Sequence, residues 1–328
     1  MAYETGTATN LEDFLGKLDT FLVANGWTQD LLDNTNNEAA WHKNSVYISV
    51  GWNTGSSGEM SLHQATGYTG GQDPGDHPGD SGNGYNTAGT PSESAILSER
   101  CVNDIGNGPY PSYHFFEQDS GPMYVHVVLE TSTDVFRHFG FGEIDKSGDW
   151  AGGEYCYGQY HSSTIAISSS SSLLLDGLYS NGSFPRRAAT MRISGMAGQP
   201  VGSVWGQIWG TSAARPDDTA TNAKVNIQGG FRAGPITEAF GWIKGTTTSG
   251  VIPGYPISLF YVDNSANFVY HLGYMADVRG VNIDSMAPAD IVTIGGEDWV
   301  FFPTSQKTTV SSSNRSYNQG IMYRKELA

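Results

Sequence analysis

Short runs of apolar and aromatic residues recur along this chain, and glycine or proline interrupts them every few residues. Runs such as 257–262 and 268–274 suit strands, because tyrosine, phenylalanine and β-branched side chains pack well on a pleated surface. The sequence holds 42 glycines, 17 tyrosines, 14 phenylalanines and 8 tryptophans. Glycine supplies the positive φ of tight turns. The pattern therefore predicts a mainly β chain of β-sandwich or barrel-like units with long Gly-rich loops.

One segment, at 10–25, follows a helical period instead. Thr9 followed by Glu12 resembles a capping box, and Asn25-Gly26 is a typical helix end. The apolar side chains recur at spacings of three and four and share one face of an N-terminal amphipathic α-helix: Leu11, Phe14, Leu15, Leu18, Phe21 and Leu22. We expect this face to pack in the core of its own domain or to fill a groove of a neighbouring subunit.

Several strands can be placed from turn signals. The runs 123–129 and 135–141 form a predicted hairpin, and 41–52 is predicted as one strand. Gly295-Gly296 between 290–294 and 299–302 predicts a tight hairpin turn. Shorter strand candidates follow the same pattern: 153–160, 190–193, 203–209, 224–227, 240–243, 257–262, 268–274 and 320–323.

The chain length of 328 residues allows one or two domains. Residues 66–94 contain almost no aliphatic side chains, so we expect an exposed loop or arm there. The serine run 168–172 suggests a boundary between an N-terminal helix and β-meander region, 1–167, and a C-terminal β-rich region, 168–328. A single domain remains an alternative.

The balance of charges bears on the partners of the chain. There are 17 Lys and Arg against 33 Asp and Glu, and the resulting charge of −16 disfavours nucleic-acid binding. No basic segment followed by an apolar run opens the sequence, and no stretch matches a membrane span, so neither a signal nor membrane insertion is expected. Cys101 and Cys156 lie in no CxxC pair; free thiols are expected, with a single disulfide as the alternative.

Motifs of catalysis are sparse, which predicts that the chain is not an enzyme and carries no catalytic residue. GxSxG, HExxH, a Walker loop and a GxGxxG between strand and helix are all missing. One alternative is glycoside hydrolysis, which needs two carboxylates across the scissile bond. The acids that could serve, with Trp150 to stack on a sugar, are Glu143, Asp145, Asp149 and Glu154.

Two weak metal-site hypotheses arise, although we expect no cofactor. Imidazoles on facing strands can bind a transition metal, but scattered histidines are more often hydrogen-bonded or solvated. Those in and near the predicted hairpin are His114, His126, His138 and His161. Loop carboxylates suit calcium, although the spacing of an EF-hand is missing and a solvated loop is the default. The calcium candidates are Asp73, Asp76 and Asp80.

Three stretches resemble a known group of proteins. They are LEDFLGKLDTFLVANGWTQD at 11–30, FRHFGFGEIDKSGDWAGGEYCYG at 136–158, and YMADVRGVNIDSMAPADIVTIGGEDWVFFP at 274–303. The sequences of these stretches are similar to those of virion structural proteins of tailed bacteriophages. The resemblance implies a repeated, symmetric assembly role in the tail, the baseplate or the head-to-tail region, and it supplies no active site.

The resemblance also implies a location and partners. The expected location is the virion, after assembly in the host bacterial cytoplasm, and the expected partners are other virion proteins and further copies of this chain in a homo-oligomer. Three alternatives stay open: a receptor- or carbohydrate-binding tail-tip protein that takes a host-surface glycan, a polysaccharide depolymerase, and a head or capsid-surface decoration protein.

Overall fold

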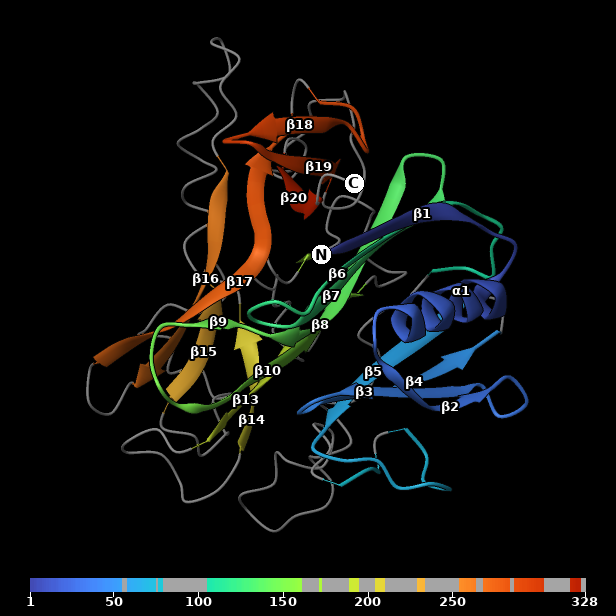
Figure 1. The fold of residues 1–328 in the computed structure, drawn as a ribbon, viewed down its shortest axis with the longest axis horizontal. Helices are drawn as coiled ribbons and strands as arrows, with labels where there is room; N and C mark the ends of the chain where they lie inside the picture. Colours follow the sequence, from blue (N-terminus) through green and yellow to red (C-terminus); the bar gives the residue numbers. More distant parts are fainter. Residues whose placement is uncertain are drawn as a thin grey trace, which may run out of the picture.

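The structure is a computed structural model that describes residues 1–54, 58–74, 76–78, 105–160, 171–172, 189–194, 204–209, 229–233, 254–263, 268–283, 286–303 and 319–325. Within these residues the chain is mainly β, as the sequence predicts, and contains a single helix (Figure 1). In that same part of the chain, no helix combines the length and the apolarity needed to cross a membrane.

A four-stranded antiparallel sheet packs against the helix α1 (Leu11–Ala24), which lies across it in Figure 1. Asn44, with a φ of 52°, turns the chain between two of its strands. The prediction of a single strand over 41–52 is therefore wrong. The strands are neighbours in chain order: β2 (Thr28–Asp33), β3 (Glu38–Lys43), β4 (Val46–Asn53) and β5 (Glu59–Ala65).

A longer sheet begins at the N-terminus. Its first neighbours, in order, are β1 (Ala2–Ala8), β6 (Tyr110–Gln118), β7 (Tyr124–Ser132), β8 (Val135–Glu143) and β10 (Ala151–Tyr157). The predicted hairpin of β7 and β8 is confirmed. Its turn is only Thr133-Asp134, because Ser132 pairs with Val135. Asp134 has a φ of 61°, a conformation that aspartate tolerates better than most residues.

The sheet continues through the rest of the chain. In order, its further strands are β13 (Ala189–Ser194), β14 (Val204–Trp209), β15 (Gly229–Ala233), β16 (Tyr255–Asp263), β17 (Phe268–Asn282), β20 (Gln319–Lys325), β19 (Glu297–Pro303) and β18 (Ile291–Ile294). Short β9 (Asp145–Lys146) pairs with β17, and β11 (Gln159–Tyr160) pairs with β12 (Ser171–Ser172).

Three of the described strand pairings cross the predicted domain boundary. β10 pairs with β13, β9 pairs with β17, and β11 pairs with β12. The division into 1–167 and 168–328 stays a prediction. Two of the strands expected from the sequence, 224–227 and 240–243, lie outside the described residues.

Strands β6 to β8 are buried on both faces, because alternate side chains enter two different cores. Val125, Val127 and Phe139 belong to the core that contains the helix. Val128 and Phe136 belong to a second core, which β17, β19 and β20 complete. This arrangement explains why the sequence around β7 reads as a continuous apolar run.

Helix α1 starts one residue later than the predicted capping box. The side chain of Asn10, not of Thr9, accepts a hydrogen bond from the backbone N–H of Asp13 at 2.8 Å. Asp13 in turn accepts from the backbone N–H of Thr9 at 2.7 Å, and this bond lowers the pKa of the Asp13 carboxyl. The helix therefore has a reciprocal N-terminal cap built from other residues than the sequence suggested.

The predicted apolar face of the helix is covered by this chain itself. Each of its six side chains is at most 3 % exposed and belongs to the first core: Leu11, Phe14, Leu15, Leu18, Phe21 and Leu22. Phe14 meets aromatic rings of β6 and β8, with Phe115 at 5.7 Å and Phe139 at 6.2 Å between ring centroids. Of the two expected roles for this face, core packing is the one found.

A buried ion pair joins the end of the helix to both sheets. The ammonium of Lys43 lies 2.8 Å from a carboxylate oxygen of Glu117 on β6, and it also donates to the carbonyl of Asn25 at 2.7 Å. The side chains are only 12 % and 3 % exposed. Removing Lys43 would leave the buried Glu117 carboxylate without its counter-charge, which is strongly destabilising. The ammonium of Lys43 also lies 3.6 Å from a carboxylate oxygen of Asp119.

Leu18→Asp is expected to lower the free energy of unfolding by about 4 kcal/mol or more, because a carboxylate would be buried in an apolar core without a partner. Urea denaturation followed by circular dichroism measures the change. The matched control is Val23→Asp on the same helix, where the side chain is 48 % exposed and the expected loss is at most about 1 kcal/mol. Equal stability of the two variants would contradict the packing of this face.

The turn between β18 and β19 generates a second prediction. Gly295 and Gly296 have φ values of 63° and 88°. Valine at both positions is expected to destabilise the protein by about 1–2 kcal/mol per residue, since β-branched side chains are strained there. Gly295→Asn is the control, because asparagine adopts positive φ readily. If the double valine variant melted at the wild-type temperature, the two-residue turn would be wrong.

Candidate functional site

The outer face of the four-stranded sheet carries the most site-like arrangement in the described chain. Along β4, Val46, Ile48 and Val50 enter the core, so Tyr47 and Ser49 face the opposite side. The segment of residues 66–74 and 76–78, here called the strap, crosses that side. Thr66 closes it, because its backbone N–H and its hydroxyl both donate to the carbonyl of Pro78, at 2.9 and 3.0 Å.

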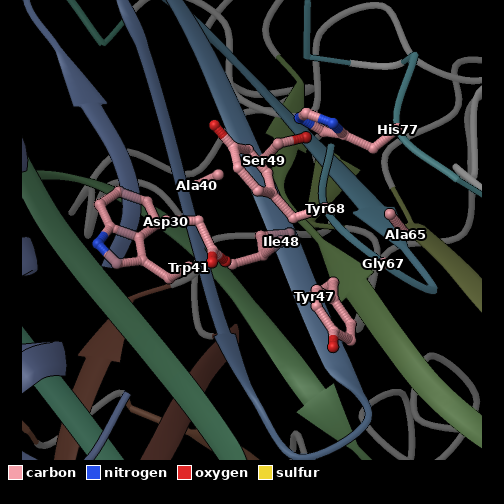
Figure 2. A pocket seen from close by; sticks show the side chains of 10 residues that line it. All are labelled: Asp30, Ala40, Trp41, Tyr47, Ile48, Ser49, Ala65, Gly67, Tyr68 and His77. Atoms are coloured by element: carbon pink, nitrogen blue, oxygen red, sulfur yellow. The ribbon is translucent and has the colours of Figure 1, made fainter. Parts of the chain in front are cut away.

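A partly open hollow lies between the strap and the sheet. Its volume is about 10 Å³, which is room for roughly one water molecule. Figure 2 shows Tyr68 and His77 of the strap beside Ser49, with their two ring centroids 4.8 Å apart. The residues that shape it include Asp30, Tyr47, Ser49, Ala65, Tyr68 and His77.

Contacts among Asp30, His42 and Tyr47 hold one wall of the hollow in place. Nδ1 of His42 lies 2.7 Å from a carboxylate oxygen of Asp30. The His42 ring also stacks on Tyr47, with centroids 4.9 Å apart and planes 15° from parallel. These contacts fix the position of the Asp30 carboxylate beside the hollow.

Ser49 forms the floor and is the unexplained member of the site. It is only 2 % exposed. Its hydroxyl oxygen has no hydrogen-bond partner among the described residues. A buried polar group left in this way costs about 1–3 kcal/mol.

Carboxylates surround the strap and the sheet beneath it. Burial, followed by the charges of Asp73 and Asp33, raises the pKa of Glu38. Burial, followed by the charges of Asp30 and Glu38, raises the pKa of the Tyr68 hydroxyl. Both shifts show that several negative charges act on the same small region.

The calcium candidates fall partly in this region. Asp73 and Asp76 lie on the strap, whereas Asp80 is outside the described residues. Where the structure describes the chain, no group of three or more Asp, Glu, His or Cys side chains converges as metal ligands would. Asp73 and Asp76 thus add negative charge to the strap, and within the described residues they belong to no set of converging metal ligands.

The histidines of the predicted hairpin are engaged elsewhere. Nε2 of His126 lies 3.3 Å from the carbonyl of Ala276, and its Nδ1 lies 3.0 Å from the hydroxyl of Tyr157. A carbonyl only accepts, so Nε2 carries the proton and Nδ1 accepts from the tyrosine. His138 does the same with the carbonyl of Pro303 and the hydroxyl of Tyr323, both at 2.8 Å.

Burial keeps these imidazoles neutral. It lowers the pKa of His126 to about 3 and that of His138 to about 4. His114, whose Nδ1 bonds to the hydroxyl of Tyr3 at 2.9 Å, also has its pKa lowered to about 4 by burial. His161 lies outside the described residues. The described rings serve as internal hydrogen-bonding groups of the second core, and do not converge on a common metal position.

The carboxylates considered for glycoside hydrolysis differ in their burial and in their partners. Glu143 and Glu154 face each other across β8 and β10. Glu154 is 3 % exposed and pairs with Arg192, while Glu143 accepts from the hydroxyl of Ser45 at 2.8 Å. Asp145 and Asp149 are exposed. Trp150 lies under the ammonium of Lys146, at 5.6 Å from its ring centroid.

The residues that build the hollow were missed by sequence reasoning. Ser49, Tyr68 and His77 form no recognised motif, and the strap was predicted only as an exposed loop. The two prolines, Pro74 and Pro78, and His77 in the otherwise glycine-rich strap were the available signal. Of the two cysteines, Cys156 is buried in β10 and Cys101 lies outside the described residues.

No protein-family model and no curated protein matches this sequence.

The neutral histidines predict acid sensitivity. The unfolded chain takes up protons near pH 6.5, whereas folded His138 does so only near pH 4. Between these values the unfolded state binds more protons, so stability falls as the pH falls. Once the pH lies below both values, one such histidine has lowered the free energy of unfolding by about 3 kcal/mol.

Urea unfolding at a series of pH values measures this dependence. His126→Gln is expected to reduce the loss between about pH 6.5 and pH 4, because glutamine can form hydrogen bonds but does not titrate. An unfolding free energy that stayed constant between about pH 7 and pH 5 in the wild-type protein would contradict the neutral, buried state of these rings.

Proposed function

We propose that this chain is a structural component of a tailed-phage virion, located in the tail or baseplate, where it acts by joining neighbouring subunits. The observation that carries the proposal is that its buried histidines and tyrosines form internal hydrogen bonds. His126, His138, Tyr157 and Tyr323 are buried and hydrogen-bonded to one another or to the backbone. Side chains of this kind stabilise a framework, and this supports an assembly role.

The size of the hollow supports the same proposal. A small-molecule site usually encloses about 300–1,000 Å³. The hollow beside the strap has about 10 Å³ and could admit one small group at most. Recognition of a neighbouring protein fits this geometry better than turnover of a soluble substrate.

Sheet edges offer a means of assembly. Within the described residues, β1 and β18 end the longer sheet and each pairs on one side only. The β18 sequence Ile291-Val292-Thr293-Ile294 is uncharged and β-branched, which suits pairing with a strand of another subunit. The proposal includes a symmetric homo-oligomer built from β-sandwich or barrel-like units, assembled in the host bacterial cytoplasm.

Electron microscopy of the intact particle tests the proposal. Density for the chain at repeated, symmetry-related positions in the tail or baseplate is the expected result. Density on the head surface would instead favour the decoration-protein alternative. Absence of the chain from purified particles, measured by mass spectrometry, would contradict a virion role altogether.

Two assays separate the remaining alternatives. A glycan array with the purified protein tests the receptor- or carbohydrate-binding role, and binding to one glycan class would favour it. Release of reducing ends from a host capsule tests the depolymerase role. Glu154→Gln is the matched variant there, since it removes one candidate acid and keeps the side-chain shape.

A further inference from the structure

One edge of β18 lies open at the end of the longer sheet, because β19 is its only neighbour among the described strands (Figure 1). The two-residue turn Gly295-Gly296 makes Ile294 and Glu297 a hydrogen-bonded pair, and such pairs alternate with non-hydrogen-bonded pairs along an antiparallel ladder. Val292 belongs to the next hydrogen-bonded pair. The backbone groups of Val292 and Ile294 are therefore used within the hairpin.

Ile291 and Thr293 offer their backbone groups to a partner strand instead. Both belong to non-hydrogen-bonded pairs of the hairpin, so their N–H and C=O groups point away from β19. The side chain of Ile291 is 48 % exposed, and Thr293 is exposed as well. A row of such groups on an uncharged, β-branched strand is a template for pairing with another chain.

The opposite end of the same sheet is protected against such pairing. Strand β1 has a register shift between Gly6 and Ala8, and it carries the charged Glu4. The ammonium of Lys17 donates to the carbonyl of Thr7 at 2.9 Å and occupies an acceptor of this strand. Bulges and charges of this kind keep edge strands from pairing between molecules. β18 has neither a charged side chain nor a register shift in its 4 residues, so it is the end open to a partner.

We propose that β18 pairs antiparallel with β18 of a second copy of this chain, about a two-fold axis at Val292. In this register Ile291 pairs with Thr293 of the second copy, and Thr293 pairs with its Ile291. All the outward N–H and C=O groups of both residues are then used, whereas a shift of the register leaves half of them without a partner. The inference rests on the proposed function, because it names a further copy of the chain as the partner in assembly.

The distribution of charge favours a second copy as the occupant of this edge. The chain has a formal charge of −16, so two copies repel each other wherever their carboxylates meet. Residues 291–294 carry no charge, so a basic partner finds no counter-charge along this strand. In the proposed register each Asp290 faces Ile294 of the other copy, which places the two Asp290 Cα atoms roughly 14 Å apart. That separation exceeds the Debye length of about 8 Å at physiological ionic strength.

Side chains add to the contact, and the ends of the strand limit it. Val292, which lies beside Trp299 and is partly buried in the hairpin, faces its own counterpart across the axis. Before the strand, Ala289 and Asp290 both hydrogen-bond to Phe301, at 2.8 and 3.0 Å, and the glycine turn follows it. A contact this short buries less than about 1,200 Å², which is typical of weak, reversible association. Because β1 is protected, the pairing closes after two copies and does not extend into a filament.

Disulfide cross-linking of the full chain tests the pairing and its register. In the proposed dimer Val292 forms a non-hydrogen-bonded pair with its counterpart, with Cα atoms about 4.5 Å apart, and a disulfide spans about 4.4–6.8 Å. Val292→Cys is therefore expected to form a covalent dimer under mild oxidation with copper phenanthroline. Mass spectrometry of the linked peptides identifies the bond. The wild-type chain, which contains Cys101 and Cys156, measures the background.

Thr293→Cys is the matched control for cross-linking. This position is the more exposed of the two, so random collisions would link it more readily. In the proposed register it faces Ile291 of the second copy, and its own counterpart lies roughly 8 Å away, too far for a disulfide. Cross-linking is therefore expected to be fast for Val292→Cys and slow for Thr293→Cys.

Sedimentation velocity of the full chain over a series of concentrations tests the dimer without a covalent bond. Ile291→Asp is expected to weaken dimerisation at least about tenfold, because it removes an apolar contact and places a charge on the edge. Val23→Asp on helix α1 makes the same charge change at a side chain that is also 48 % exposed, and it is expected to leave dimerisation unchanged. Thermal melts establish that both variants are folded.

Three results would overturn the proposal. Cross-linking of Thr293→Cys at the rate of Val292→Cys would mean that the copies meet at random. A monomer at every concentration, or equal weakening by Ile291→Asp and Val23→Asp, would exclude β18 as the interface. None of these results affects the virion role if the chain is found in purified particles. A β18 dimer of a chain that is absent from the particles would overturn the virion role alone.

Discussion

Burial of the apolar face of α1 is the interaction on which the rest of the structure depends. Phe14 and Leu18 pack between the four-stranded sheet and strands β6 to β8, so one core holds both sheets. The indole of Trp41 on β3 donates to Asp19 at 2.8 Å and fixes the helix on the sheet. Because the helix occupies the inner face, the outer face is left for the strap and its acid-rimmed hollow.

A second core, between β6–β8 and strands β17, β19 and β20, follows from that arrangement. Its polar members pair across long stretches of sequence, as Tyr124 does when it donates to Asp277 at 2.7 Å. Such groups must be satisfied in place because water cannot reach them. The stability of this core therefore depends on neutral imidazoles and phenols, which makes His114, His126 and His138 part of the framework.

The elements that sequence reasoning found are those with a strong local pattern. The helix over Leu11–Ala24 has an uninterrupted apolar period, and the β7–β8 and β18–β19 hairpins have turn residues between apolar runs. Among the elements it missed, β1, β2, β5 and β6 either lack regular alternation or are too polar to stand out. In β1, AYETGTA offers few apolar side chains, and only its pairing with β6 makes it a strand.

The sequence by itself determined the mainly β class, the position of the helix and the Gly295-Gly296 turn, because backbone preferences and periodicity act between residues close in the chain. Only the tertiary structure decided that Asn44 divides one expected strand in two, and that His126 and His138 bond to distant tyrosines. It alone brought Asp30, Ser49 and Tyr68 together around one hollow. Such meetings depend on strand pairing and on the shared core, which join residues that no local pattern relates.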